Sequence, residues 1–226
     1  MGYAGYVAAH LRKDLRLEWR AKDSINGMLF FSLLVVVVFS LAFDPTAYPT
    51  IARQISGGLL WVGLLFAAMT ALNQSWAREL HNQVLDAQRL APAPASALFV
   101  GKALANFLFV LGVEVVLAPV FAVFYNLHPL GNGWLLLLIL PLGTWALVVN
   151  GTFFAALSLR TRSREMLLPL VLLPVAAPAL LAMIQTTTAV LTGEFEPGLW
   201  LRLLVAYDIV FTTLCVLLFD LVLRED

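Results

Sequence analysis

Six long apolar stretches alternate with short polar segments along the 226-residue chain. A helix rising about 1.5 Å per residue needs about twenty apolar residues to cross roughly 30 Å of hydrocarbon. The pattern therefore predicts an all-α membrane bundle with six transmembrane helices, and the short connections favour a single domain. The predicted spans cover residues 25–43, 55–72, 97–125, 134–157, 167–190 and 203–223.

Residues 1–23 have two stripes at helical spacing. Apolar residues recur every four positions from Tyr3 to Trp19, while Arg12, Arg16 and Arg20 form the second stripe. This pattern predicts an amphipathic helix that lies on the inner membrane surface, with its cations facing anionic lipid headgroups. The alternative is a basic flank that only fixes the topology.

Residues 76–90 are the most polar stretch after the N-terminus. They keep helical spacing until Pro92 and Pro94 stop the helix, because proline lacks the amide donor. Trp76, at the start, is expected at the headgroup boundary. A helix too polar to enter lipid is either a solvated connector or a docking surface for a soluble partner.

Charge decides the orientation, since Lys and Arg are retained on the cytoplasmic side. Of the fourteen Lys and Arg residues, only Arg53 and Arg202 fall in outer loops if the N-terminus is inside, which leaves twelve on the inner side. Both termini are therefore predicted to be cytoplasmic, in a multi-pass membrane protein. The composition is 61% hydrophobic with a net charge of zero, which argues against nucleic-acid binding.

Two carboxylates fall inside predicted spans: Glu114 in mid-span, and Asp208 near the outer end of the last span. A charge at the centre of a membrane helix costs about 2.5–3.5 kcal/mol, so such side chains face a partner or a cavity. Either they line a transport path and exchange protons, or they make interhelical hydrogen bonds.

Pro169, Pro174 and Pro178 fall in the fifth predicted span. Their spacing requires at least one of them to remove an interior amide and kink the helix. The kink is either a mechanical hinge or a packing irregularity.

Several kinds of catalytic and cofactor chemistry are missing from the chain. It has no phosphate-binding loop, so any ATP energy must come from another subunit. The single cysteine, Cys215, excludes covalent c-type haem attachment and a Cys-rich metal site, and it is expected as a small buried residue. His128 is the only histidine on the predicted outer side, and it is either an axial haem ligand or a turn residue.

Several segments together resemble one known family, in the expected order and over nearly the whole chain. They are KDLRLEWR at 13–20, APAP at 91–94 with LFVGK at 98–102, GTFFAALS at 151–158, REMLLPLVLLPVAAP at 164–178, YDIVF at 207–211 and FDLVLRE at 219–225. The chain resembles the cytochrome c maturation haem-exporter B family. None of these segments is catalytic.

The resemblance implies the non-catalytic membrane subunit of an ABC-type complex with the fold of type-II exporter permeases, located in the bacterial inner membrane. Two copies would sit on two ATPase subunits that bind ATP, beside other cytochrome c maturation membrane subunits and a periplasmic haem chaperone. Haem would be the substrate. The output is either haem translocation or release of the haem-loaded chaperone.

In that family the loop after the second span holds the coupling helix. The resemblance therefore places the ATPase contacts within residues 76–90. Where the family pattern leads us to expect a glycine before the Leu-acidic pair, this chain has Gln83-Val84-Leu85-Asp86, which predicts a more continuous helix. The candidate contacts are Arg78, Glu79, Leu80, Asp86 and Arg89.

Two other functions remain open from the sequence. The first is an ion-coupled secondary transporter that uses Glu114 and Asp208 as proton sites and needs no ATPase. The second is a non-transporting scaffold that only assembles other membrane subunits.

Overall fold

The computed structural model describes residues 2–21, 23–81, 94–159 and 164–224, and within them all regular structure is helical. The elements are α1 (Tyr3–Ala21), α2 (Asp23–Phe43), α3 (Pro49–His81), α5 (Ala95–Phe124), η1 (Gly133–Leu135), α6 (Leu136–Ser158), α7 (Arg164–Thr192) and α8 (Gly198–Arg224). Two of these elements are not long hydrophobic helices: the N-terminal helix and a short 3₁₀ turn.

Six of these helices are long and apolar enough to cross a membrane, which confirms the predicted all-α class and six spans. Most boundaries agree within a few residues. The largest difference is in α3, which extends from Pro49 to His81 instead of covering only 55–72. Polar residues interrupt the apolar run at both ends of α3, so a hydropathy pattern detects only its middle.

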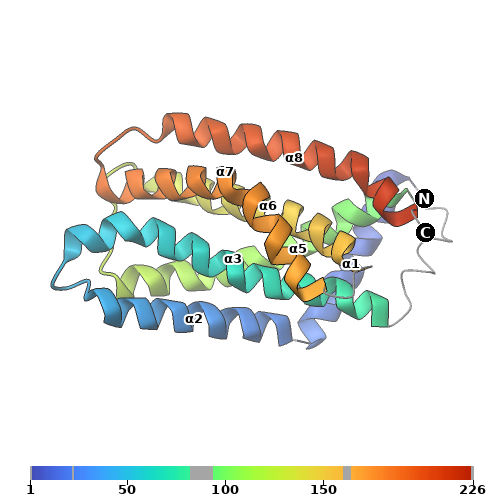
Figure 1. Cartoon of the computed structure of the whole chain (residues 1–226), viewed down its shortest axis with the longest axis horizontal. Coiled ribbons are helices and arrows are strands. Elements are labelled where there is room, and N and C mark those ends of the chain that lie inside the picture. The colour runs from blue at the N-terminus through green and yellow to red at the C-terminus, as the bar shows by residue number, and fades with distance from the viewer. Residues whose placement is uncertain (1, 22, 82–93, 160–163, 225–226) are drawn as a thin grey trace.

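The six spans alternate in direction, and both termini therefore lie at the same end of the bundle (Figure 1). Helix α1 lies at this end and runs obliquely across the long helices. We call this end the basic end; it comprises α1, the last turns of α3 and the first turns of α5. That it faces the cytoplasm stays a prediction.

Helices α3 and α6 form the centre of the bundle, with 61% and 56% of their apolar windows buried, against 17% for α2 and 22% for α8. Helix α3 packs against α2, α6 and α7, and α6 packs against α5, α7 and α8. The outer helices consequently present apolar side chains such as Leu41 and Val123 at the surface. Such a surface suits lipid or a membrane partner.

Close helix packing at the centre depends on one tryptophan and one glycine. Trp61 of α3 is fully buried, and its Nε1 donates a hydrogen bond to Thr187 Oγ1 at 2.9 Å. Its ring lies against Gly143 of α6, where a Cβ atom would come within 2.3 Å of the ring. Only glycine leaves room for the ring here, as is common where membrane helices approach closely.

Helix α7 contains all three prolines, Pro169, Pro174 and Pro178, within its helical residues. Figure 1 shows that α7 bends, its first part running obliquely and its second part aligning with its neighbours. The bend agrees with the predicted loss of interior amide donors. A hinge role for it stays a prediction.

Candidate functional site

Three helices that are distant in sequence meet at the basic end around one buried lysine. Lys102, in the second turn of α5, has a side chain that is only 1% exposed. Its Nζ lies 2.9 Å from Glu79 Oε1 on α3 and 3.2 Å from Asp14 Oδ2 on α1. A buried ammonium group is tolerable only when anions compensate it, and these two carboxylates do so.

Three further ion pairs, made by Lys13 and Arg78, extend this arrangement to the surface. Lys13 Nζ lies 2.5 Å from Glu79 Oε1 and 3.2 Å from Asp14 Oδ1. Burial alone would lower the pKa of Lys13, but attraction by these two carboxylates dominates and raises it. Arg78 of α3 pairs with Glu18 of α1. We call these six residues the ion-pair cluster; its three cations and three anions balance.

The cluster rests on a tryptophan that links it to α6. Lys102 Nζ lies 4.7 Å from the centre of the Trp76 ring, a cation–π distance. Trp76 Nε1 donates to the carbonyl oxygen of Thr152 at 2.9 Å, and Asn106 Nδ2 donates to Thr152 Oγ1 at 3.0 Å. Trp76 is 1% exposed, so its ring packs against the cluster inside the protein, and its place at the headgroup boundary stays a prediction.

The predicted separate helix at 76–90 needs a correction. Residues 76–81 are the last turns of α3, because the helix does not break where the hydrophobic run ends. Glu79 is 4% exposed, so its carboxylate serves the cluster and not the surface, whereas Leu80 is 44% exposed. Arg78 is one-third exposed. Residues 82–90, with Asp86 and Arg89, lie outside the described residues.

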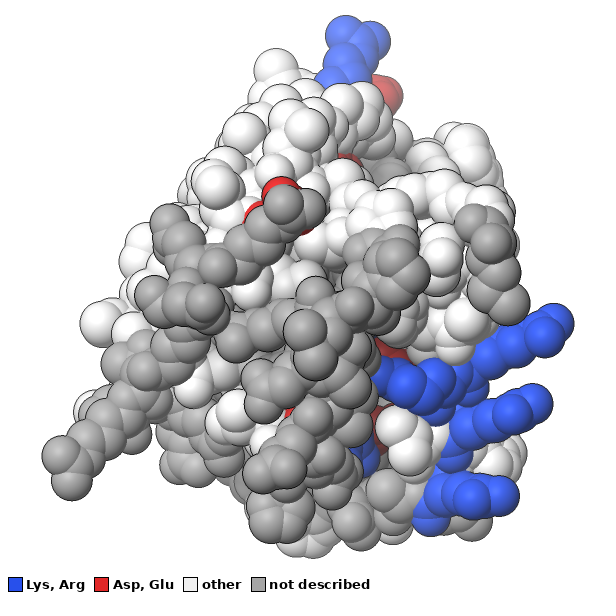
Figure 2. Space-filling model, turned by 90° about the vertical axis from the view of Figure 1, so that its right-hand side faces the viewer, with Lys and Arg blue, Asp and Glu red and all other residues white. Residues whose placement is uncertain are grey.

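Helix α1 turns an acidic face toward the bundle, which the two-stripe pattern missed. Asp14 and Glu18 are buried, while Arg12, Arg16 and Arg20 are exposed. Figure 2, which looks at the basic end, shows Lys and Arg side chains projecting from one edge of the molecule. The four-residue spacing of the two acids is the signal that could have predicted this face.

Helix α1 also packs closely on α5. A Cβ atom at Gly101 would lie 2.7 Å from His10 Cβ and 2.9 Å from the Val7 carbonyl oxygen. The pKa of His10 is lowered, first by burial and next by the charge of Lys13. The N-terminal helix is therefore held by tertiary contacts with α3 and α5 as well as by its amphipathic pattern.

The two carboxylates inside the spans lie in different environments. Glu114 is fully buried and accepts a hydrogen bond from Thr144 Oγ1 on α6. Asp208 is 7% exposed, and neither carboxylate oxygen has a hydrogen-bond partner among the described residues. Asp208 lies ten residues after Gly198, the first residue of α8, and therefore roughly 15 Å from the start of this helix. Any role of either group in transport stays a prediction.

Next to Asp208, a chain of hydrogen bonds joins α6, α7 and α8. The hydroxyl of Tyr207 donates to the carbonyl oxygen of Val175 at 2.9 Å and lies 3.2 Å from Asn150 Nδ2, which donates to it. Cys215 of α8 is buried, as predicted, with Sγ 4.0 Å from Asn150 Oδ1. These contacts fix the rotation of α8 against its neighbours.

Comparison with known proteins supports one assignment. The family model described as CcmB protein matches residues 6–225. The chain belongs to the CcmB family. Heme exporter protein B of Rhodobacter capsulatus is 38% identical over 77% of this chain and 79% of its own length. Heme exporter protein B of Pseudomonas aeruginosa is 31% identical over 89% of this chain and 90% of its own length. The resemblance drawn from the sequence is thus confirmed.

The described part of this CcmB chain contains no group of three or more His, Cys, Asp or Glu residues that could hold a metal ion. His128 is exposed in the segment after α5, with Nδ1 3.3 Å from the Asn126 carbonyl oxygen. This is the geometry of a turn residue, and haem ligation by His128 stays a prediction.

Proposed function

We propose that this CcmB chain is the membrane subunit of an ATP-driven complex for haem export in cytochrome c maturation. Its relatives are named heme exporter protein B, and the chain itself has no phosphate-binding loop. The observation that carries the mechanism is the ion-pair cluster, which joins the end of α3 to α1 and α5.

The cluster allows the end of α3 to transmit a displacement to the neighbouring helices α1 and α5. A force applied by an ATPase to the chain after His81 acts first on the last turn of α3. Glu79 in that turn is held by Lys102 at 2.9 Å and by Lys13 at 2.5 Å. Separating buried opposite charges is costly, so a displacement of α3 is shared with α1 and α5. Arg78 and Leu80, both accessible, are the described candidates for direct ATPase contact.

The remaining partners follow from the same proposal. A second copy of the chain, other cytochrome c maturation membrane subunits and a periplasmic haem chaperone complete the complex. The apolar surfaces of α2 and α8 supply room for membrane partners. Haem is the substrate, ATP is bound by the partner, and the output is either haem translocation or chaperone release.

A charge swap on the Arg78–Glu18 pair tests the proposal. Arg78→Glu should reduce stimulation of the partner's ATPase at least tenfold in the reconstituted complex, because it sets two acids against each other at Glu18. The double variant Arg78→Glu with Glu18→Arg restores an ion pair and should recover most of the stimulation. Arg202→Glu, at the opposite end, is the matched control.

Three outcomes would reject the mechanism or the function. Normal stimulation with Arg78→Glu would remove the cluster from the coupling mechanism. Failure of any ATPase to copurify with the chain from its native membrane would contradict the ATP-driven function. Proton-driven transport by the isolated chain, lost in Glu114→Gln, would favour the ion-coupled carrier instead.

A further inference from the structure

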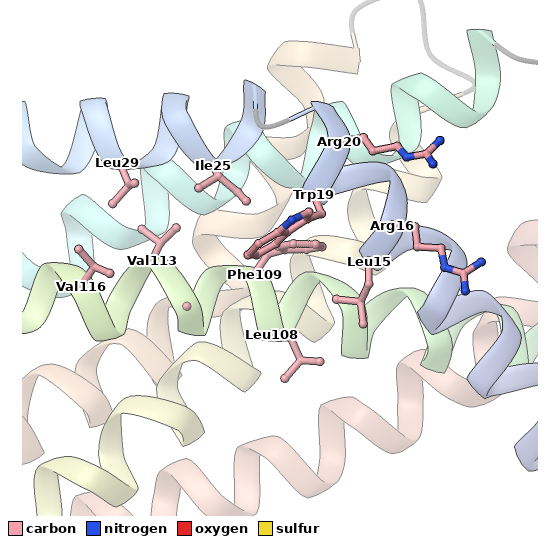
Figure 3. A pocket seen from close by; sticks show the side chains of 11 residues that line it. Leu15, Arg16, Trp19, Arg20, Ile25, Leu29, Leu108, Phe109, Val113 and Val116 are labelled. Carbon is pink, nitrogen blue, oxygen red and sulfur yellow. The ribbon is translucent and has the colours of Figure 1, made fainter.

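An apolar hollow lies beside the ion-pair cluster, between α1, α2 and α5. It has a volume of about 660 Å³, and its walls are almost wholly apolar. Figure 3 shows Trp19 of α1 next to Phe109 of α5, with Ile25 and Val113 further along the groove. Trp19 is 73% exposed, so the groove opens at the molecular surface.

A second hollow, of about 550 Å³, adjoins the first along α1. The two share Arg16 and Arg20 in their linings, and Arg12 and Lys13 line the second hollow as well. In Figure 3 the guanidinium groups of Arg16 and Arg20 extend away from the apolar side chains of the groove. The combined site therefore has one apolar part and one cationic part.

Among the described residues, Arg12, Arg16 and Arg20 form no ion pair, although Asp14 and Glu18 lie on the same helix. Those two acids face the bundle: Asp14 pairs with Lys13 and Lys102, and Glu18 pairs with Arg78. A ligand that fits must bring both an apolar body and a negative charge.

We propose that this site binds one anionic phospholipid, with an acyl chain in the groove between α1, α2 and α5 and the phosphate at Arg16 and Arg20. Guanidinium groups are suited to phosphate because they offer several donors in a fixed plane. Basic pockets between membrane helices are a known form of anionic lipid recognition. The proposal goes beyond haem export and does not depend on it. The bound lipid would add contacts between α1 and α5 next to the ion-pair cluster, which also holds these helices together.

Native mass spectrometry of the full chain in detergent tests the proposal, with dioleoyl phosphatidylglycerol and dioleoyl phosphatidylcholine as probes. Both lipids have the same acyl chains, so only the headgroup differs. We expect retention of phosphatidylglycerol in preference to phosphatidylcholine. Arg16→Gln with Arg20→Gln should weaken phosphatidylglycerol binding about 25-fold, since each cation near an anionic lipid contributes roughly a factor of five. The control, Arg53→Gln with Arg202→Gln, removes the same charge near the opposite end and should change nothing.

A second variant tests the apolar part. Gly112 lines the groove, and a Cβ atom there would meet nothing within 4 Å, so Gly112→Leu fills the groove without disturbing the helix packing. It should lower phosphatidylglycerol retention at least tenfold, while Gly58→Leu, at another open helical glycine, should not. Equal retention of both lipids by the unchanged protein would overturn the proposal. Full phosphatidylglycerol binding by either test variant would overturn it as well.

Discussion

Replacement of Lys102 by methionine is the sharpest test of the ion-pair cluster. Methionine keeps much of the length of the side chain but removes the ammonium group, which contacts Glu79 at 2.9 Å and Asp14 at 3.2 Å. Removal of one partner from a buried ion pair typically costs about 3–5 kcal/mol, because the other charge stays buried without compensation.

The contacts of Lys102 indicate that its replacement by methionine lowers the folding stability by an amount near the lower end of this range. Lys13 still contacts both Glu79 and Asp14 in the variant, so neither carboxylate is left wholly unpaired. The cation–π contact with Trp76 is lost as well, which adds a smaller cost. We therefore expect a loss of about 3 kcal/mol, which in a chain of this size lowers the melting temperature by roughly 6–12 °C.

Thermal unfolding of the purified chain in a mild detergent measures this loss. Lys13→Met is the matched control: its side chain is 32% exposed, so its removal should cost less than about 1 kcal/mol. The double variant Lys102→Met with Glu79→Gln removes one charge of each sign and should be more stable than Lys102→Met alone. Equal effects of the two single lysine variants, or additivity in the double variant, would refute the buried-charge argument.

Substitutions at three further positions test the packing and the electrostatics. Gly143→Ala should destabilise the bundle by about 1–3 kcal/mol, since its methyl group meets the Trp61 ring; an unchanged melting temperature would contradict the close packing. Thr144→Val should cost about 1–3 kcal/mol by removing the donor to Glu114, whereas Thr144→Ser should be near neutral in the same unfolding assay. The pKa of His10 is below 6.5 in the folded chain. The stability contributed by neutral His10 is therefore fully present above about pH 6.5 and is lost as the pH falls through the pKa of the folded state. His10→Gln should reduce this loss of stability in melting curves recorded from about pH 5 to pH 8.

The sequence predicted the six spans because the bilayer imposes a local requirement. Each crossing needs an uninterrupted apolar run, and such a run is visible without knowledge of any neighbour. The ends of α3 were not predicted, because they are polar and a local apolar run does not mark them. Trp76 and Glu79 belong to a polar stretch by composition, yet they extend a membrane helix because Lys102 and Thr152 supply their partners from other helices.

The ion-pair cluster could be predicted only in part. Lys102 follows a proline-rich segment at the start of a span, where a cation usually marks topology and nothing more. Its partners lie 23 and 88 positions away along the chain, so no spacing rule connects them. The one local signal was on α1, where Asp14 and Glu18 are four residues apart and must share a face.

The polar contacts have a common physical cause. Inside lipid, helices gain little from the hydrophobic effect when they associate, because lipid tails are as apolar as their side chains. Specific packing must then come from close approach at small residues, such as Gly143, and from hydrogen bonds between helices. The contacts of Trp61 with Thr187 and of Tyr207 with Val175 tie α7 to α3 and α8 in this way.

At the basic end the ion pairs are partly exposed, so water and salt compete with the partner side chains for their charges. The Lys102 side chain is only 1% exposed and that of Lys13 is 32% exposed, so the inner half of the cluster is screened far less by salt than the outer half. High salt should consequently loosen Lys13 from its partners and leave Lys102 bound to both Glu79 and Asp14. Through Asp14, helix α1 then stays attached to α3 and α5, as the proposed link between a partner ATPase and the spans requires.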